Sequence, residues 1–182
     1  MNHIIIFPTD TVYGMGTPYL NKEGLKKIYE IKGRDFNKPI AVLVSNIDQV
    51  KQIGLMDESI EIILQNFWPG ALTIILNSTP QYFEVSGEKT IGVRMPNHPL
   101  ALELIEKLGP LKTTSVNQSN EAPLNDYELI LKTYGHLVDK VYPNDLKLTE
   151  TSSTVIDFTK EELIIIRQGD VTLKDIQNVL NK

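Results

Sequence analysis

The sequence contains no cysteine and only three histidines. The absence of cysteine excludes disulfides, thiolate nucleophiles, zinc ribbons and cysteine-ligated iron–sulfur clusters. The histidines, His3, His98 and His136, do not have the spacing of a transition-metal site. No apolar run approaches the roughly 18 residues of a membrane span, and the N-terminus lacks the pattern of a signal peptide. We therefore expect a cytoplasmic protein without a membrane segment.

Two common nucleotide-binding motifs are also missing. Gly14-Met15-Gly16 begins a Rossmann fingerprint, but Tyr19 stands where the third glycine belongs. The Gly-x-x-x-x-Gly-Lys-Ser/Thr pattern of a P-loop does not occur. If the protein binds ATP, it therefore uses neither of these loops.

The composition is that of an ordinary globular domain. The chain has 182 residues, of which 41% are hydrophobic and 23% are charged, with a formal net charge of −5. A chain of this length buries roughly 70% of its unfolded surface, which is enough for one core. We expect a single domain over residues 1–182. The acidic balance argues against binding to nucleic-acid backbones over the whole surface.

Strand and helix patterns alternate along the chain, which favours layers of helices on a sheet. Apolar runs without alternation are typical of strands buried on both faces, and helices show apolar residues at three- and four-residue spacing. We predict an α/β fold with a twisted, largely parallel or mixed sheet flanked by helices. The predicted strands are His3–Phe7, Ile40–Ser45, Ala71–Leu76, Ile91–Val93 and Leu163–Ile166. The predicted helices are a segment that starts near Leu25 and ends at Gly33, Glu58–Phe67, Pro99–Leu108, Asn125–Tyr134 and Thr172–Leu180.

Polar side chains gather in five clusters close to the ends of predicted strands, where open α/β sheets bind ligands. Each cluster alone also fits turns, helix caps, salt bridges or hydroxyl-rich loops. His98, just before a predicted helix, suits a capping or surface role. The clusters are Pro8–Gly14, Lys32–Pro39, Thr90–Pro96, Thr113–Asn120, and Ser152–Asp157 with Ile166–Gly169.

Two of these clusters carry cations in informative positions. Lys32 lies seven residues after Leu25 and so extends the apolar stripe of its helix. A lysine in such a place either extends its ammonium to solvent or directs it at a ligand. With Arg34 and Lys38 it makes a candidate triphosphate clamp. Arg94 ends a strand and suits either a bound carboxylate or a structural salt bridge.

The joint order of the short motifs is more specific than any one of them. Together they closely resemble the YrdC/TsaC family, the threonylcarbamoyl-AMP synthases, over roughly Ile4 to Asp170. The motifs are Pro8-Thr9-Asp10-Thr11-Val12-Tyr13-Gly14, Lys32-Gly33-Arg34, Trp68-Pro69-Gly70, Gly92-Val93-Arg94-Met95-Pro96-Asn97-His98-Pro99, Ser115-Val116-Asn117, Ser153-Thr154-Val155 and Arg167-Gln168-Gly169.

The resemblance implies an activity and a fold. Family members condense L-threonine, bicarbonate or CO2, and ATP with Mg²⁺ into threonylcarbamoyl-AMP and pyrophosphate. A separate transferase then modifies tRNA to threonylcarbamoyladenosine. The implied fold is a twisted α/β sheet with a concave, partly cationic cavity. The implied substrate and partner set is therefore ATP, L-threonine and bicarbonate, with tRNA and a downstream transferase complex.

The resemblance also assigns roles to residues. Lys32 and Arg34 would hold the phosphates and act in catalysis, and no residue is assigned to a metal. On the threonine side the implied residues are Thr11, Arg94, Thr113 and Ser153. On the nucleotide side they are Lys32, Arg34, Lys38, Thr90, Ser115, Asn117 and Arg167.

Two alternatives stay open, the second of them because the loop Ser119–Pro123 departs from the family pattern. Asn120 stands where glycine usually follows, although asparagine tolerates a left-handed backbone. The first alternative is a double-stranded RNA or tRNA-binding module without catalysis. The second is a catalytically degenerate domain that binds the nucleotide or threonine but no longer couples them.

Overall fold

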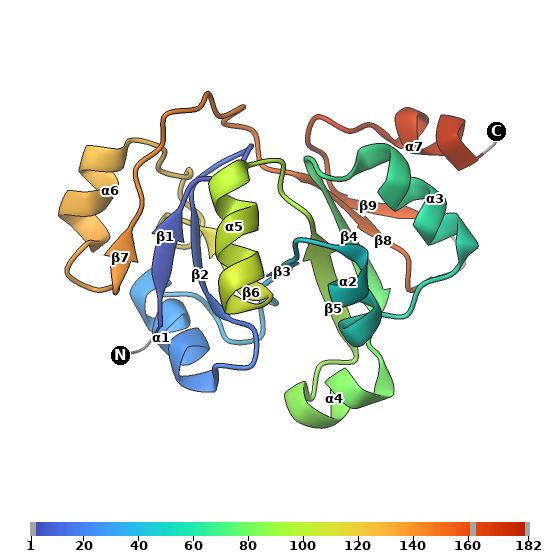
Figure 1. The fold of residues 1–182 in the computed structure, drawn as a ribbon, viewed down its shortest axis with the longest axis horizontal. Coiled ribbons are helices and arrows are strands. Elements are labelled where there is room, and N and C mark those ends of the chain that lie inside the picture. The colour runs from blue at the N-terminus through green and yellow to red at the C-terminus, as the bar shows by residue number, and fades with distance from the viewer. Residues whose placement is uncertain (1–2, 161–162, 181–182) are drawn as a thin grey trace.

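Nine strands in the described residues form the centre of the molecule. The computed structural model describes residues 3–160 and 163–180, and Figure 1 shows the strands as one continuous, strongly twisted sheet. The strands are β1 (Ile5–Phe7), β2 (Gly14–Pro18), β3 (Val42–Leu43), β4 (Leu72–Asn77), β5 (Thr90–Arg94), β6 (Leu111–Ser115), β7 (Lys140–Val141), β8 (Thr154–Asp157) and β9 (Ile164–Arg167).

The sheet is mixed, as predicted, and has the order β7-β1-β2-β6-β3-β5-β4-β8-β9. Parallel pairs are the minority, however, because only β1–β7, β3–β5 and β4–β8 are parallel among these strands. The remaining neighbours, such as β2–β6 and β4–β5, are antiparallel. The apolar run of β1 therefore reflects burial on both faces and not parallel pairing alone. The expectation of burial on both faces is wrong for the run Leu163–Ile166, because β9 is an edge strand and Ile166 is exposed.

Seven helices in the described ranges cover the sheet. Five of them, α1, α3, α5, α6 and α7, match the predicted helices to within a few residues. Gly33 ends α1 with a left-handed backbone (φ 56°), as expected for a glycine cap. The helices are α1 (Lys22–Lys32), α2 (Ile47–Ile53), α3 (Glu58–Phe67), α4 (Pro80–Ser86), α5 (Pro99–Leu108), α6 (Tyr127–Tyr134) and α7 (Leu173–Leu180).

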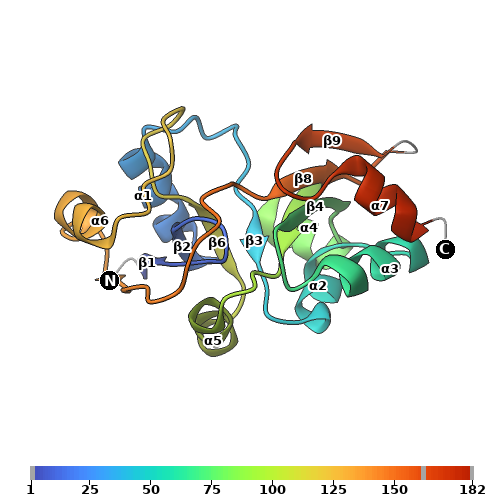
Figure 2. The same cartoon turned by 90° about the horizontal axis from the view of Figure 1, so that it is seen from above.

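Both faces of the β1–β2–β6 half of the sheet are covered. Ile4 and Ile6 pack in one apolar cluster with α1 and α6. Ile5 and Phe7 point the other way and pack against α5, which Figure 2 shows on the opposite side of the sheet from α1. This arrangement explains why the first strand has no alternation of apolar and polar residues.

The β5–β4–β8 half is covered on one face only. Ile74, Val93 and Ile156 belong to an apolar cluster with residues of α2, α3 and α7. The alternate residues of β4 and β5, such as Thr73 and Gly92, face the other side and line a cavity. The fold therefore leaves one part of the sheet open to a ligand.

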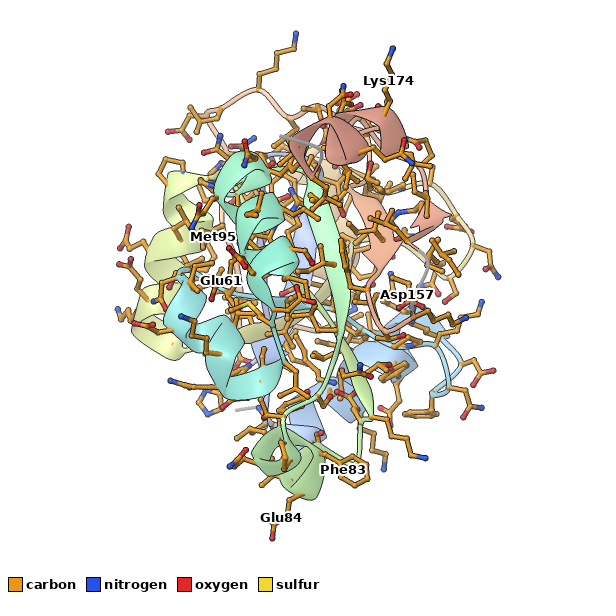
Figure 3. The ribbon with its side chains drawn as sticks, turned by 90° about the vertical axis from the view of Figure 1, so that its right-hand side faces the viewer. Glu61, Phe83, Glu84, Met95, Asp157 and Lys174 are labelled. Atoms are coloured by element: carbon orange, nitrogen blue, oxygen red, sulfur yellow. The ribbon has the colours of Figure 1, made fainter. Side chains whose placement is uncertain are left out.

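Two short helices that the sequence analysis did not predict, α2 and α4, follow turns in this half. In Figure 3, α4 lies at one end of the molecule, with Phe83 and Glu84 labelled on it. Within the described parts of the chain, no helix is long and apolar enough to cross a membrane.

Candidate active site

A cavity of about 330 Å³ lies on the open face of the sheet, between its two halves. This volume falls in the usual range for small-molecule sites. The walls come from the Thr9–Gly14 turn, the loop that follows α1, and strands β4, β5, β6, β8 and β9. None of the described residues lining the cavity carries a carboxylate, whereas three are arginines. The cavity is therefore suited to anionic ligands.

Eight of the eleven predicted site residues line this cavity, although they come from distant parts of the sequence. They are Thr11, Arg34, Thr90, Arg94, Thr113, Ser115, Ser153 and Arg167. Lys32, Lys38 and Asn117 are not among the lining residues. The sequence prediction that these polar clusters converge is thus confirmed for most of the set.

Arg94 is almost completely buried at the end of β5 and is fixed by three partners. Its Nη2 lies 2.5 Å from Asp10 Oδ1, its Nη1 donates to Thr11 Oγ1 at 2.8 Å, and its Nε donates to the Gly70 carbonyl at 2.9 Å. Burial lowers the pKa of Arg94, while the Asp10 carboxylate opposes that shift. A guanidinium has five N–H donors, and two of those of Arg94 bond no other described residue.

The structure confirms the salt-bridge interpretation of Arg94, whereas its contact with a bound carboxylate stays a prediction. The salt bridge to Asp10 holds the guanidinium in one orientation, and the backbone N–H of Asn97 donates to the same Asp10 oxygen at 3.0 Å. Gly70 belongs to the Trp68-Pro69-Gly70 motif, and Trp68 Nε1 donates to the Leu72 carbonyl at 2.7 Å. This motif builds the turn that positions Arg94.

Arg167 and Ser153 lie side by side at the β8–β9 wall. Arg167 Nε donates to the Ser153 carbonyl at 3.0 Å, and its Nη2 donates to Ser153 Oγ at 3.2 Å. Ser153 Oγ is also 2.8 Å from Thr73 Oγ1. The sequence analysis divided Arg167 and Ser153 between the nucleotide and threonine sides, but the fold places them in one group.

Arg34 lies at the opposite wall, in the loop between α1 and β3. Its Nη2 donates to the Pro39 carbonyl at 2.9 Å and its Nε to the Lys38 carbonyl at 3.3 Å. Among the described residues Arg34 has no ion pair with a carboxylate. Its positive charge is therefore available to the cavity.

Lys32 is buried, but its ammonium contacts protein oxygens instead of facing the cavity. Lys32 Nζ donates to the Ser115 carbonyl at 2.6 Å, the Asn117 carbonyl at 2.8 Å and Asn117 Oδ1 at 3.0 Å. These three bonds use all three of its donors. Burial, with a smaller contribution from Arg34, lowers the pKa of Lys32 to about 8. In this geometry the Lys32 ammonium has no donor left for a phosphate, and its direct phosphate contact stays a prediction.

Asn117 holds the loop that follows β6. Its Oδ1 accepts from Lys32 and from Ser115 Oγ, and its Nδ2 donates to the carbonyls of Gln118 and Glu121. Asn120 has a left-handed backbone (φ 70°), as expected for the residue that replaces glycine. The altered loop therefore keeps an ordered turn beside the cavity.

Three features of the site region differ from or add to the sequence analysis. His98 is buried at the start of α5 and makes no side-chain cap. Its Nε2 lies 3.1 Å from Asn144 Oδ1, so it is neither a cap nor a surface residue. Thr114, which lines the cavity, belongs to the predicted cluster Thr113–Asn120 but had no assigned role, whereas Thr73, another lining residue, was not predicted. Thr73 follows the Trp68-Pro69-Gly70 motif by three residues, and that motif was the available signal.

Known proteins resemble this chain over nearly its whole length. A family model described as Sua5_yciO_yrdC, telomere recombination, matches residues 1–169. Threonylcarbamoyl-AMP synthase of Bacillus subtilis (strain 168) is 33% identical over 98% of this chain and 53% of its own length. A putative threonylcarbamoyl-AMP synthase of Methanocaldococcus jannaschii is 32% identical over 95% of this chain and 83% of its own. The chain thus spans about half the length of the first of these relatives.

Solved structures give the same result for the fold. The crystal structure of P. abyssi Sua5 complexed with L-threonine superposes with a TM-score of 0.90 at 29% identity, covering 98% of this chain and 54% of that one. The structure of E. coli YciO gives a TM-score of 0.85 at 26% identity, covering 96% and 86%. The match in sequence and in sheet architecture establishes that this chain belongs to the Sua5/YciO/YrdC family.

Proposed function

We propose that this chain is an L-threonylcarbamoyl-AMP synthase. The reaction joins L-threonine, bicarbonate and ATP, and it yields threonylcarbamoyl-AMP, pyrophosphate and water. The observation that carries the proposal is the cavity itself, in which three arginines and a set of hydroxyl groups face one space with no carboxylate among the described lining residues. The names of the relatives and the L-threonine complex of P. abyssi Sua5 support the same activity.

The amino acid is assigned to the wall formed by Arg94, Arg167 and Ser153. Two N–H donors of Arg94 have no partner in the described part of the chain, and Asp10 and Gly70 hold the guanidinium in place. A guanidinium with a fixed orientation binds a carboxylate better than a mobile one, because little side-chain freedom is lost on binding. Thr11 and Thr113 supply hydroxyl groups on the adjoining wall.

The nucleotide is assigned to the wall formed by Arg34, Thr90 and Ser115. Arg34 has no carboxylate partner in the described chain and so meets the triphosphate. Lys32 and Asn117 act from behind this wall by fixing the Ser115–Asn117 turn. Lys38, an exposed residue whose Nζ lies 3.4 Å from Asn120 Oδ1, lies beside the same turn.

Magnesium enters this proposal with the nucleotide. Mg²⁺ is commonly held by substrate phosphates and a few carboxylates or waters. The described residues contain no group of three or more histidines and acidic side chains that fits a metal. We propose that the ion arrives as part of the Mg–ATP substrate.

The chemistry requires positioning and charge stabilisation more than a nucleophilic side chain. The threonine amine takes up CO2 and loses a proton to become a carbamate. A carbamate oxygen then attacks the α-phosphorus as the bond to pyrophosphate breaks. Negative charge develops on the phosphoryl oxygens, where fixed cations lower the barrier. Holding two weak reactants side by side supplies a further share of the rate.

The transfer of the threonylcarbamoyl group to its acceptor and the cellular compartment of the protein stay predictions. The acceptor of the threonylcarbamoyl group is expected to be tRNA, reached through a separate transferase complex. The cytoplasm is the expected compartment.

The test is release of pyrophosphate by the purified chain with Mg–ATP and bicarbonate, with and without L-threonine. We expect release that depends on threonine, together with a product of the mass of threonylcarbamoyl-AMP. A folded sample that binds both substrates without turnover would instead indicate the degenerate domain. Binding of RNA without binding of ATP would indicate the nucleic-acid module.

A further inference from the structure

Thr73 lies in the middle of β4 on the face that forms the cavity floor. It pairs with Val155 of β8 and is 6% exposed. Its side chain lines the cavity, and its Oγ1 lies 2.8 Å from Ser153 Oγ. It is therefore a buried hydroxyl group next to the assigned amino-acid wall.

The hydrogen-bond inventory of Ser153 limits what that residue can do. A hydroxyl group has one proton to donate and two lone pairs to accept with. Arg167 donates from Nη2 to Ser153 Oγ at 3.2 Å, and a guanidinium only donates. The bond between Ser153 and Thr73 uses one of the two hydroxyl protons. One proton of the pair is thus left for a ligand.

The charge of Arg167 decides between the two arrangements. A hydroxyl that accepts from a cation becomes a better donor, so bonds that run head to tail strengthen one another. The favoured order is Arg167 to Ser153 to Thr73. In the opposite order Ser153 Oγ would accept from both Arg167 and Thr73. The bond between Ser153 and Thr73 would then not be strengthened by the charge of Arg167. The head-to-tail order leaves the Thr73 proton, and not the Ser153 proton, directed into the cavity.

We propose that Thr73 is a substrate-binding residue that donates the last hydrogen bond of the chain Arg167–Ser153–Thr73 to an anionic oxygen of the amino acid or its carbamate. This inference rests on the proposed function and refines it. The sequence analysis assigned the direct contact to Ser153. Here Ser153 is a positioning residue that relays the polarisation by Arg167.

The experiment compares threonine binding and turnover in Thr73→Val and Ser153→Ala. Thr73→Val removes the terminal donor and should raise the Kd and KM for L-threonine about tenfold or more, as expected for a bond to a charged group. Ser153→Ala leaves the Thr73 hydroxyl in place and should raise them less. Thr73→Ser restores the hydroxyl and should bind threonine like the wild type. The KM for ATP should change little in all three.

Thr17→Val is the matched control. Thr17 is a buried threonine of β2 whose Oγ1 accepts from Asn21 Nδ2, and it is not among the cavity-lining residues. Its substitution should leave threonine affinity unchanged. If Thr73→Val does not fold, Thr73→Ala removes the same hydroxyl with a smaller side chain.

The outcomes separate this inference from the proposed function. Calorimetric titration with L-threonine measures binding without turnover. A larger loss in Ser153→Ala than in Thr73→Val, or wild-type affinity in Thr73→Val, would overturn the role of Thr73 while the activity stands. Threonine binding that depends on Thr73 without pyrophosphate release would keep the contact and overturn the synthase. A wild-type chain that neither binds threonine nor releases pyrophosphate would overturn both.

Discussion

At the scale of the residue, the two cations of the Lys32-Gly33-Arg34 motif have different roles. Lys32 has all its donors on protein oxygens, whereas Arg34 bonds two carbonyls of its own loop and has no described carboxylate partner. The spacing of one residue places them on either side of the glycine cap of α1. Within this motif, Lys32 therefore supports the structure of the neighbouring turn, whereas Arg34 is the candidate phosphate-binding group.

Lys32 should make the stability of the protein depend on pH. Its pKa in the folded chain is about 8, below the value of 10.5 for a free lysine. Between these values the folded state binds fewer protons than the unfolded state, so the free energy of unfolding gains a term that grows as pH rises. Urea unfolding from pH 7 to pH 10.5 should show this term in the wild type and not in Lys32→Met. Parallel curves for the two proteins would contradict it.

Arg34 should affect turnover far more than folding, because its side chain is half-buried and lies in a loop. We expect Arg34→Ala to lower kcat/KM for ATP by tenfold to a hundredfold, the usual range for a lost charge-assisted bond. Lys27→Ala is the control, since Lys27 lies on α1, the helix just before the Arg34 loop, and pairs with Glu30 at 3.6 Å. Equal activity of the two variants would show that Arg34 does not meet the phosphates.

At the scale of the element, strand β2 is built to lie close to β6. Gly14 and Gly16 face Ser115 and Thr113 across this antiparallel pair. A Cβ atom at Gly16 would lie 2.6 Å from Thr113 Oγ1. The two glycines therefore make room for the Thr113 side chain, which lines the cavity.

Gly16→Ala should destabilise the protein by about 1–3 kcal/mol through overpacking and should also raise the KM for threonine, because Thr113 must move. Thr113→Ala removes the atom in the way. The double variant should therefore be more stable than the sum of the two single changes implies, as measured by thermal and urea unfolding. If the destabilisation of the double variant equals the sum of the two single changes, a close contact between residue 16 and Thr113 is contradicted.

The elements that the sequence predicted well are those with long apolar periodicity. Helices α3 and α5 begin and end at the predicted residues, because their stripes face an apolar cluster and Pro69 or Gly109 follows each of them closely. Strands β2 (Gly-Met-Gly-Thr-Pro) and β6 (Leu-Lys-Thr-Thr-Ser) lack such a pattern. The side chains of β2 and β6 are small or polar because they line the cavity or allow close packing between the two strands. The sequence analysis, which relied on apolar runs, therefore did not predict these strands.

The same reasoning explains the limits of the site prediction. Arg94 and Ser153 were identified because polar residues beside buried strands suggest a ligand. Thr73 was missed because it lies inside an apolar strand, where only its position three residues after the Trp68-Pro69-Gly70 motif could have marked it. The contacts of Lys32 were not predictable either, since its partners are backbone carbonyls more than 80 residues away in the sequence.

At the scale of the whole molecule, the cavity joins two halves that the sheet connects only weakly. The β7-β1-β2-β6 half and the β5-β4-β8-β9 half meet at β3, which has two residues. Arg94 adds a second connection, because its ion pair with Asp10 links β5 to the turn after β1. Breaking a buried pair of this kind by removing one partner typically costs about 3–5 kcal/mol.

Substrates that fill the cavity should therefore stabilise both halves together. Threonine and a non-hydrolysable Mg–ATP analogue, each at about 100 times its Kd, should each add about 2.7 kcal/mol. For a chain of this size each addition corresponds to a rise in Tm of roughly 5–10 °C. Hydrogen exchange should slow on both sides of the cavity, in β2 and β6 as well as in β8 and β9, because the lining residues come from both sides. Protection confined to one half would mean that the ligands contact one wall only, and the assignment of threonine and nucleotide to opposite walls would then be wrong.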